Sequence, residues 1–324
     1  MFHAVHARMI ALWIEFPSIA LCLVSCGGRN RLHHFSSDST VPEPESTAGH
    51  HIKNVFLIVM ENHNWTGDGS LNIKGNNDAP YINRTLAPMG AHPSRYYNPS
   101  GVHPSLPNYL WLEAGTDFGL FNVNSVFAHS QSTTFHLVTL LKNAGISWRS
   151  YDEYTSGTDC PLGQWHTPMV FFDDVTNQDD WHSSYCISHI RPMSQLWSDL
   201  KNNTTAHYSF IKPNLCHSMH SSCNGENQIK QGDVWLSEHV PQIMSSAAYR
   251  NGGVIFIVFD EANLGDGPIP ALILSPYAKK GYTNSTYYNH SSLLRTVQEI
   301  FGVGPLLRNA AKQSDLKEFF TVFP

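Results

Sequence analysis

The run Lys53-Asn-Val-Phe-Leu-Ile-Val-Met60 decides the fold, because it is almost continuously apolar and ends abruptly in polar residues. Such a run, rich in branched side chains, predicts a strand that is buried on both faces, as in parallel sheets. The run Gly252-Gly-Val-Ile-Phe-Ile-Val-Phe259 repeats this pattern much later in the chain. Two fully buried strands this far apart indicate an α/β fold with a mostly parallel sheet.

Acidic and amide side chains follow both runs directly. Glu61 and Asn62 come after the first strand, and Asp260 and Glu261 come after the second. Ligands of open α/β sheets bind outside the carboxyl ends of the strands, so we expect these side chains to share one site. Clustered carboxylates need a cation or shared protons to be tolerated. Their oxygens, together with an amide oxygen, suit a hard divalent cation.

The segments between the two strands alternate in the manner of an α/β protein. We predict helices at 133–144, 231–248 and 290–301, and further strands at 146–151, 207–212 and 269–275. Segment 152–206 has no clear period and holds two cysteines, so we expect a disulfide-pinned excursion that forms part of the site wall.

The stretch His103-Pro-Ser-Leu-Pro-Asn-Tyr-Leu-Trp-Leu-Glu-Ala-Gly115 predicts a further helix that begins near its two prolines. Pro107 suits a first helical turn, where its missing N–H costs nothing. Ser105 would lie at or just before the N-cap, close to free N–H groups that favour anions. Simple capping is one role for this serine. Beside a metal ion, the same hydroxyl is a candidate nucleophile.

Composition limits the function classes. A length of 324 residues allows one large domain or two small ones, and 41% hydrophobic residues supply an ample core. The net charge of −6 argues against a nucleic-acid binder that relies on a basic surface. The 19 histidines would make the chain strongly cationic below about pH 6.5, which suits acidic surroundings.

The N-terminus is typical of an exported protein. Residues 1–26 are interpreted as a signal peptide, and Leu23-Val-Ser-Cys26 resembles a bacterial lipobox with Cys26 as the lipidated residue. A plain secretory peptide is the alternative, so the protein would be periplasmic, an outer-membrane lipoprotein or secreted. Residues 27–50 are expected to be a flexible tether, and residues 51–324 a single catalytic domain.

In an exported protein, the remaining four cysteines are expected to form disulfide bonds. Cys160, Cys186, Cys216 and Cys223 allow three pairings, and the local one joins Cys160 to Cys186 and Cys216 to Cys223. An oxidising compartment would let these bonds persist. A zinc knuckle at 216–223 is the competing interpretation, although its spacing fits standard zinc patterns poorly.

Ordered motifs give the chain a family resemblance. The motifs are Ile58-Val-Met-Glu-Asn62, Pro104-Ser-Leu-Pro-Asn108, Pro213-Asn-Leu-Cys-His-Ser-Met-His220, Phe259-Asp-Glu261 and His290-Ser-Ser-Leu-Leu-Arg-Thr296. With them, the chain from about residue 53 to about 303 resembles the phosphoesterase family of bacterial and fungal acid phosphatases and phospholipases C. That family lies within the alkaline-phosphatase-like superfamily. The resemblance implies a three-layer α/β/α sandwich with a mostly parallel central sheet.

The resemblance also implies a role for each site residue. Ser105 would attack phosphorus and form a phosphoserine, and Asn108 would bind a phosphate oxygen. A divalent metal ion would be held by the Ser105 oxygen with Glu61, Asn62, Asp260 and Glu261. His220 and His290 would contact phosphate or a second cation. Asn214 stands where two-metal relatives carry Asp, so one tightly bound metal ion is favoured and a second site stays open.

The roles of several other polar residues are less specific. His103, His166 and His217 are candidate phosphate contacts. His63 and His136 are expected to be solvent-facing or hydrogen-bonded filler. Asp173 and Asp174 are expected to be solvated loop charges.

The sequence therefore predicts an exported, metal-dependent acid phosphatase that hydrolyses phosphoric monoesters. Its substrate would be a phosphorylated small molecule or a phospholipid headgroup, with no nucleic-acid partner. The N-terminal lipid would allow membrane attachment, and a monomer is expected. A phospholipase C-like phosphodiesterase is the alternative enzyme, and a non-catalytic surface binding protein is the alternative from another class.

Overall fold

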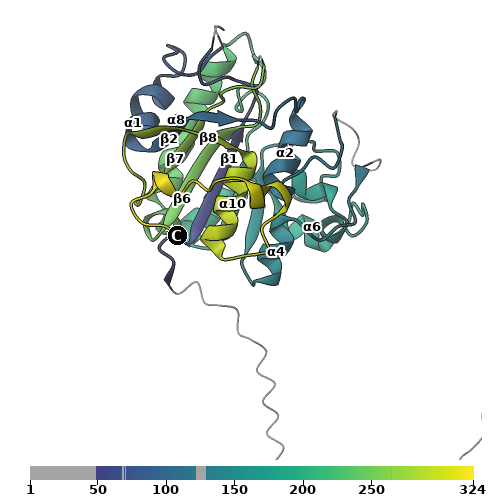
Figure 1. Cartoon of the computed structure of the whole chain (residues 1–324). Helices are drawn as coiled ribbons and strands as arrows, with labels where there is room; N and C mark the ends of the chain where they lie inside the picture. Colours follow the sequence, from purple (N-terminus) through teal and green to yellow (C-terminus); the bar gives the residue numbers. More distant parts are fainter. Residues whose placement is uncertain (1–48, 68, 70, 122–128, 264) are drawn as a thin grey trace, which may run out of the picture. The chain divides into compact units, whose positions relative to one another are not determined.

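Eight strands form one mixed sheet in the order β4-β3-β5-β1-β6-β7-β2-β8 (Figure 1). All neighbouring strands run parallel except β7, which is antiparallel to both β6 and β2. The strands are β1 Asn54–Met60, β2 Ala91–Tyr97, β3 Trp148–Asp152, β4 Ile190–Pro192, β5 Tyr208–Lys212, β6 Gly253–Phe259, β7 Ala271–Leu274 and β8 Tyr282–Asn289. The predicted mostly parallel sheet is confirmed.

The computed structural model describes residues 49–67, 69, 71–121, 129–263 and 265–324. The described residues belong to one compact unit, Glu43–Pro324. The predicted signal peptide, its Cys26 and tether residues 27–48 lie outside the described residues. Among the described residues, no helix is both long and apolar enough to cross a membrane.

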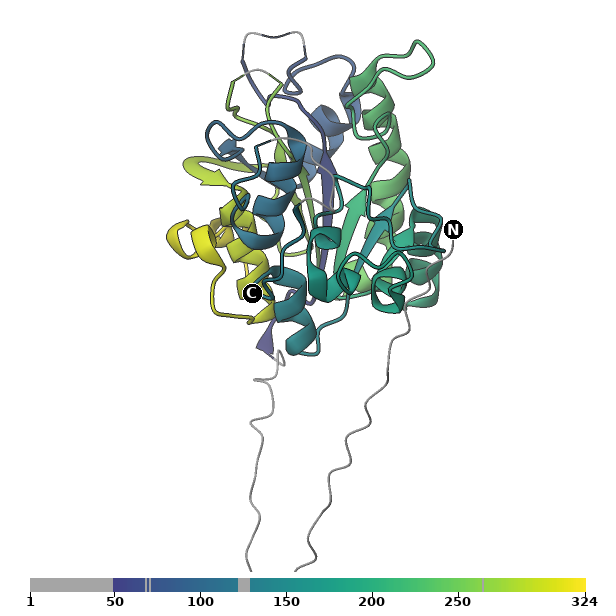
Figure 2. The same cartoon turned by 90° about the vertical axis from the view of Figure 1, so that its right-hand side faces the viewer.

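Helices lie on both faces of the sheet, as the turned view of Figure 2 shows. Helices α2, α4 and α10 gather on one face, and α8 lies on the other (Figures 1 and 2). The α-helices are α1 Ala87–Met89, α2 Ser105–Ala114, α4 Leu137–Asn143, α5 Asp173–Thr176, α6 Ser184–His189, α7 Met193–Asn202, α8 Gln228–Ser245, α9 Ala247–Arg250 and α10 His290–Phe301. Single turns of other helix types are η2 Ile82–Leu86, η3 Pro168–Phe171, η4 Arg308–Lys312 and η5 Lys317–Phe319. This arrangement is the predicted α/β/α sandwich.

The two apolar runs form adjacent strands at the centre of the sheet. β1 and β6 pair in register from Asn54 with Gly253 to Met60 with Phe259, and every residue of β6 is buried. Strands buried on both faces need apolar residues throughout, which explains why neither run alternates. Because both strands end at the same edge of the sheet, the acidic residues that follow them become neighbours.

Some elements escaped the sequence analysis. β2 and β8 were not predicted, because their exposed and buried residues do not form a long apolar run. The excursion at 152–206 is more regular than expected, since it contains α5, α6, β4 and α7. Helix α7 is amphipathic, but its apolar positions are few and easily overlooked. The excursion is nevertheless pinned as predicted.

Both local disulfides are confirmed. Cys160 pairs with Cys186 across 26 residues, and Cys216 pairs with Cys223 across 7 residues. The second bond closes the loop that carries His217 and His220. The zinc-knuckle alternative is therefore wrong, because both of its cysteines are consumed.

Candidate active site

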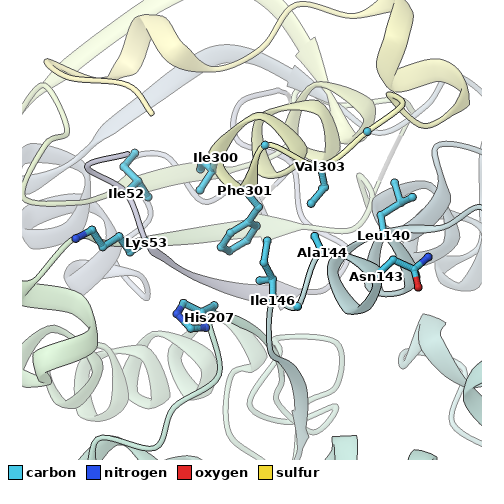
Figure 3. Close-up of a pocket in the computed structure, with 13 residues that line it drawn as sticks. Ile52, Lys53, Leu140, Asn143, Ala144, Ile146, His207, Ile300, Phe301 and Val303 are labelled. Carbon is cyan, nitrogen blue, oxygen red and sulfur yellow. The ribbon is translucent and has the colours of Figure 1, made fainter. Parts of the chain in front are cut away.

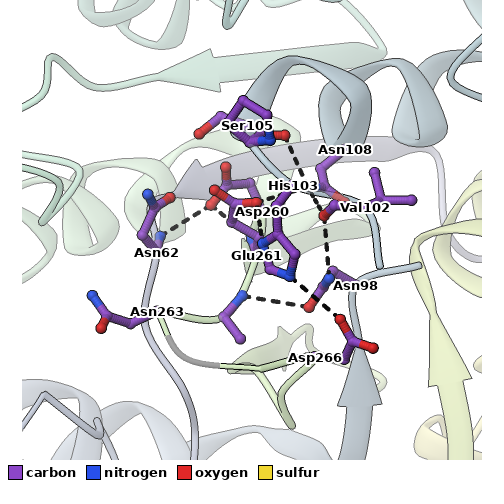
Figure 4. Close-up of polar contacts among 12 residues, drawn as sticks. Asn62, Asn98, Val102, His103, Ser105, Asn108, Asp260, Glu261, Asn263 and Asp266 are labelled. Carbon is purple, nitrogen blue, oxygen red and sulfur yellow. Dashed lines mark hydrogen bonds and ion pairs between the residues drawn. The ribbon is translucent and has the colours of Figure 1, made fainter. Parts of the chain in front are cut away.

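The carboxyl ends of β1 and β6 bring the predicted acidic residues together. Glu61 and Asp260 are both fully buried, and the backbone N–H of Asn62 donates to Asp260 Oδ1 at 3.0 Å. Asn62 adopts a left-handed backbone conformation with φ of 46°, which asparagine tolerates better than most residues. This turn directs the Asn62 side chain toward the carboxylates of Asp260 and Glu61. Figure 4 shows Asn62 beside Asp260.

Ser105 lies directly against this cluster at the start of α2. Its hydroxyl donates to Glu61 Oε2 at 3.1 Å, and the Tyr109 hydroxyl donates to Glu61 Oε1 at 2.6 Å. The predicted capping role is wrong: Pro104 is the N-cap, Ser105 is the first helical residue, and no side chain caps the helix. The serine hydroxyl is thus engaged by a carboxylate rather than by its own helix.

The three carboxylates perturb one another strongly. Burial, followed by repulsion from Glu61 and Glu261, raises the pKa of Asp260 well above its ordinary value. Burial is also the main reason that the pKa of Glu261 rises to about 7. Burial disfavours ionised Glu61 too, but attraction to His166 and Lys212 outweighs it, so the pKa of Glu61 lies below its ordinary value. Such a cluster is short of positive charge.

The donor set fits a hard divalent cation. Asp260 Oδ2 is buried without a hydrogen-bond partner among the described residues. The Asn62 amide oxygen faces Asp260 Oδ1 at 3.1 Å and Glu61 Oε2 at 3.3 Å, where only a rotated amide or a cation relieves the repulsion. Within the described part of the chain, no three His, Cys, Asp or Glu side chains are placed to hold a metal ion by themselves. The amide and hydroxyl oxygens of Asn62 and Ser105 would have to complete the set.

Glu261 is turned toward a second group of residues. Its Oε2 lies 2.7 Å from His103 Nδ1, and it accepts a hydrogen bond from Asn108 Nδ2 at 3.2 Å. His103 also lies 3.3 Å from Asp266, so carboxylates occupy both of its ring nitrogens. Asn108 Nδ2 further donates to the Val102 carbonyl at 3.0 Å. In this arrangement, the predicted phosphate contacts of His103 and Asn108 would require these bonds to be exchanged.

His166 is the predicted histidine that lies against Glu61. Its Nε2 lies 3.4 Å from Glu61 Oε1, and burial lowers its pKa to about 4. His220 is exposed and hydrogen-bonded to Ser221, yet it is close enough to influence the pKa values of both Glu61 and His166. Both histidines therefore lie near Glu61.

Two other predicted histidines occupy different places. His217 pairs with Glu153 at 2.7 Å, away from the carboxylate cluster. His290 is fully buried, with Nε2 against the Asp260 backbone carbonyl at 2.5 Å and Nδ1 against the Tyr96 hydroxyl at 3.1 Å. Both ring nitrogens of His290 are occupied, so its geometry favours support of the Asp260 backbone over the predicted contact with phosphate.

Lys212 is a charged residue at this edge that the sequence analysis did not single out. It ends β5, the strand next to β1, and its fully buried ammonium has no hydrogen-bond partner among the described residues. Its Nζ lies 4.7 Å from the centre of the Tyr154 ring. The rule that identified Glu61 would also have found Lys212, because both are charged residues at the end of a buried parallel strand.

The sequence is similar to those of known proteins. A model described as the Phosphoesterase family matches residues 70–304. The chain is 28% identical over 257 residues to a phosphatidylinositol-3-phosphatase of Mycobacterium tuberculosis, covering 77% of each protein. It is 25% identical over 267 residues to a probable acid phosphatase of Kluyveromyces lactis, covering 76% of this chain but only 57% of the yeast protein.

A comparison of structures bears on the fold. A Vibrio parahaemolyticus protein of the alkaline phosphatase superfamily superposes with a TM-score of 0.56 at 15% identity. The match covers 84% of this chain and 73% of that protein. At this identity, the likeness shows the fold alone, which is the predicted alkaline-phosphatase-like sandwich.

Proposed function

The chain belongs to the phosphoesterase family and is a phosphoric ester hydrolase, and we propose that it is a metal-dependent acid phosphatase acting on monoesters through a phosphoserine at Ser105. The observation that carries this proposal is the Ser105 hydroxyl, which donates to Glu61 at 3.1 Å inside a cluster of buried carboxylates. A serine that only caps a helix does not require buried carboxylates beside it. Two of the relatives are named as phosphatases, which supports a monoester substrate.

The chain's own residues would hold the reactants as follows. Glu61, Asn62, Asp260 and Ser105 would bind one divalent metal ion, with Glu261 beside them. When bound, such an ion stabilises negative charge on the phosphoryl oxygens and on the serine oxygen. His166 and His220 would donate hydrogen bonds to the phosphoryl oxygens. Placement of charge in a dry site contributes much of the catalysis in phosphoryl transfer.

The reaction would take two steps. Ser105 Oγ attacks phosphorus, its proton passes to a neighbouring carboxylate of the cluster, and the bond from phosphorus to the alcohol oxygen breaks. The alcohol leaves with the bonding electron pair and takes up a proton. Water then attacks the phosphoserine, inorganic phosphate leaves, and Ser105 regains a proton. The hydrogen bond from Tyr109 would keep Glu61 oriented throughout.

A substitution separates an enzyme from a binding protein. We expect Ser105→Ala to lower kcat on nitrophenyl phosphate by at least about 10³-fold without lowering the melting temperature. Ser237→Ala, at a half-buried position of α8, is the matched control and should keep full activity. Metal-dependent turnover that survives Ser105→Ala would show that another group is the nucleophile.

A substrate comparison separates the two enzyme classes. The rates on nitrophenyl phosphate and on the matching methyl nitrophenyl diester should differ by at least about 10-fold in favour of the monoester. A clear preference for the diester would make the phosphodiesterase alternative correct. Export and acidic working conditions belong to the same proposal, and they rest on the N-terminal sequence and the histidine content.

A further inference from the structure

Lys212 carries a buried ammonium group that the proposed mechanism does not use. It ends β5, its side chain is fully buried, and its Nζ has no hydrogen-bond partner among the described residues. The Nζ lies 4.7 Å from the centre of the Tyr154 ring, which is a cation–π contact. Burying a charge costs free energy unless polar groups compensate it. A charge that is kept at such a cost is a candidate for a functional role.

The Lys212 side chain lies on the face of the sheet that carries the proposed nucleophile. Residues two apart in a strand point to the same face, so Lys212 shares a face with Phe210. The Phe210 ring packs against Tyr109 of α2, with ring centres 6.2 Å apart. The Tyr109 hydroxyl in turn donates to Glu61 Oε1 at 2.6 Å. The ammonium and Glu61 are therefore covered by the same helix, which begins at Ser105.

The strand register also places Lys212 level with the carboxylate cluster. β5 pairs with β1, and Ile211 lies opposite Ile58. One residue further along both strands, Lys212 is level with a position two residues before Glu61. On the other side of β5, Lys212 pairs with Asp152 of β3. Lys212 thus lies between Asp152 and the carboxylate cluster.

Asp152 is not a direct hydrogen-bond partner of this ammonium. Its Oδ1 accepts a hydrogen bond from the Tyr154 N–H at 2.7 Å, and its Oδ2 accepts one from the Thr167 hydroxyl at 2.9 Å. Other donors therefore engage both oxygens of this carboxylate. An ammonium with a purely structural role would be expected to bond directly to its acid.

The charges around Lys212 act on it from a distance. Burial lowers the pKa of Lys212, whereas attraction to nearby carboxylates opposes this and favours the charged form. These carboxylates are those of Asp152, Glu61, Glu153 and Asp260. Charges interact more strongly inside a protein than in water, so contact is not required. Lys212 is therefore a fixed positive charge whose field reaches the cluster.

We propose that Lys212 is a specificity-determining residue whose fixed positive charge favours a doubly charged phosphoryl group at Ser105 over a singly charged one. This inference rests on the proposed phosphatase function and adds a physical basis for the preference for monoesters. A monoester carries close to two negative charges at about pH 7, whereas a diester carries one. Ser105 Oγ lies 3.1 Å from Glu61, so a phosphoryl group on this oxygen would lie in the same field.

Tungstate and perrhenate test this inference, because they are tetrahedral oxyanions of similar size that carry two charges and one charge. Their inhibition constants are measured at about pH 7 with nitrophenyl phosphate as substrate. Lys212→Met should weaken tungstate by at least about 10-fold, and perrhenate by only about the square root of that factor, because attraction scales with charge. The melting temperature should be unchanged or higher, since a buried charge is replaced by an apolar side chain of similar length.

Lys53→Met is the matched control. Lys53 is an exposed lysine just before β1, and it lines a cavity of about 630 Å³ at the amino end of that strand (Figure 3). Its charge therefore lies at the opposite end of β1 from Glu61. Lys53→Met should leave both inhibition constants unchanged.

Equal weakening of both oxyanions in Lys212→Met, or no weakening, would overturn the inference. If Lys212→Met does not fold, Lys212→Gln is measured with the same expected constants. If the constants respond as expected but turnover survives Ser105→Ala, the proposed nucleophile is wrong and the role of Lys212 stands. If Ser105→Ala abolishes turnover while neither constant responds to Lys212→Met, only the inference about Lys212 fails.

Discussion

Helix α2 has buried carboxylates at both ends, and these carboxylates have different partners. At the first residue, Ser105 meets Glu61 inside a cluster that also holds Asp260 and Glu261. At the other end, Glu113 is buried against His136, with Nδ1 to Oε1 at 2.8 Å. The first cluster contains three carboxylates close together, whereas in the second the imidazole of His136 lies beside the carboxylate of Glu113.

The cluster at Glu113 is nearly complete by itself. His136 Nε2 lies 2.9 Å from Asp174 Oδ1, so the imidazole stands between two carboxylates, and Phe172 stacks on it with ring centres 3.7 Å apart. Val138 N–H also donates to Glu113 at 2.9 Å. The expectation that Asp174 is a solvated loop charge is wrong, because it is ion-paired and its side chain is only 21% exposed.

This difference separates a cluster with a structural role from a cluster that lacks a partner for its negative charge. A buried carboxylate is tolerated when the protein supplies a charge partner and hydrogen bonds. At Glu113 that partner is His136. At Asp260, Oδ2 is buried and unpartnered among the described residues, and the nearest charges are like charges. We interpret the first as a tie among α2, α4 and α5, and the second as a cation site.

The largest expected effect separates the two clusters by activity. Asp260→Asn should lower kcat/KM on nitrophenyl phosphate by at least about 10³-fold, because it removes a proposed metal ligand. The free energy of unfolding of the chelator-treated variant should be unchanged or higher, since one repelling charge is gone. Asp174→Asn is the matched control and should lower stability while keeping activity. If the two variants lost the same activity and the same stability, the distinction between the two clusters would be wrong.

The second effect is on stability. His136→Ala should lower the free energy of unfolding by about 3–5 kcal/mol, because it leaves the buried Glu113 and the partly buried Asp174 without their charge partner. Urea unfolding at constant pH measures this. His182→Ala is the control, since the His182 side chain is 84% exposed and only loosely paired. A loss below about 1 kcal/mol would show that the His136 cluster does not tie the helices together.

The third effect is the response to metal. Adding a divalent cation to chelator-treated protein at about 100 times its Kd should stabilise the fold by about 2.7 kcal/mol. A rise in melting temperature reports this. The same addition should leave a Glu61→Gln/Asp260→Asn variant unchanged. His136→Ala should keep the full response, and a response lost in that variant would mean that the clusters are not independent.

The smallest effect is a pH dependence of the His136 cluster. Burial lowers the pKa of His136, but its bonds to Asp174 and Glu113 outweigh this, so the folded pKa lies above the usual 6.5. A raised histidine pKa contributes stability that is fully present below about 6.5 and is lost as pH rises through the folded value. The stability difference between wild type and His136→Gln should therefore shrink between about pH 5 and about pH 9. A difference that grows over this range would contradict the pairing.

The sequence predicted the centre of the molecule well for a physical reason. β1 and β6 are buried on both faces, so their apolar runs carry an unmistakable pattern, and the residues that follow them must lie at the sheet edge. β2 and β8 have mixed burial, so no pattern marks them. Lys212 ends a predicted strand, but its position beside Glu61 follows only from the strand order, in which β5 is next to β1.

Side-chain partners were the least predictable part. Position alone cannot tell that His290 lies behind Asp260 with both nitrogens occupied, or that His217 pairs with Glu153. His136 was expected to be solvent-facing or hydrogen-bonded filler; it is hydrogen-bonded, but its acidic partners, 23 and 38 residues away, could not be predicted. Such pairings depend on how helices pack across the sheet, which a single sequence does not encode in a local pattern.

The metal content of the purified protein tests the central claim most directly. Elemental analysis should find one divalent metal ion per chain in the wild-type protein, and none in the Glu61→Gln/Asp260→Asn variant, with activity following the metal. An active wild-type protein without bound metal would contradict the account, and so would a folded double variant that retains the same metal.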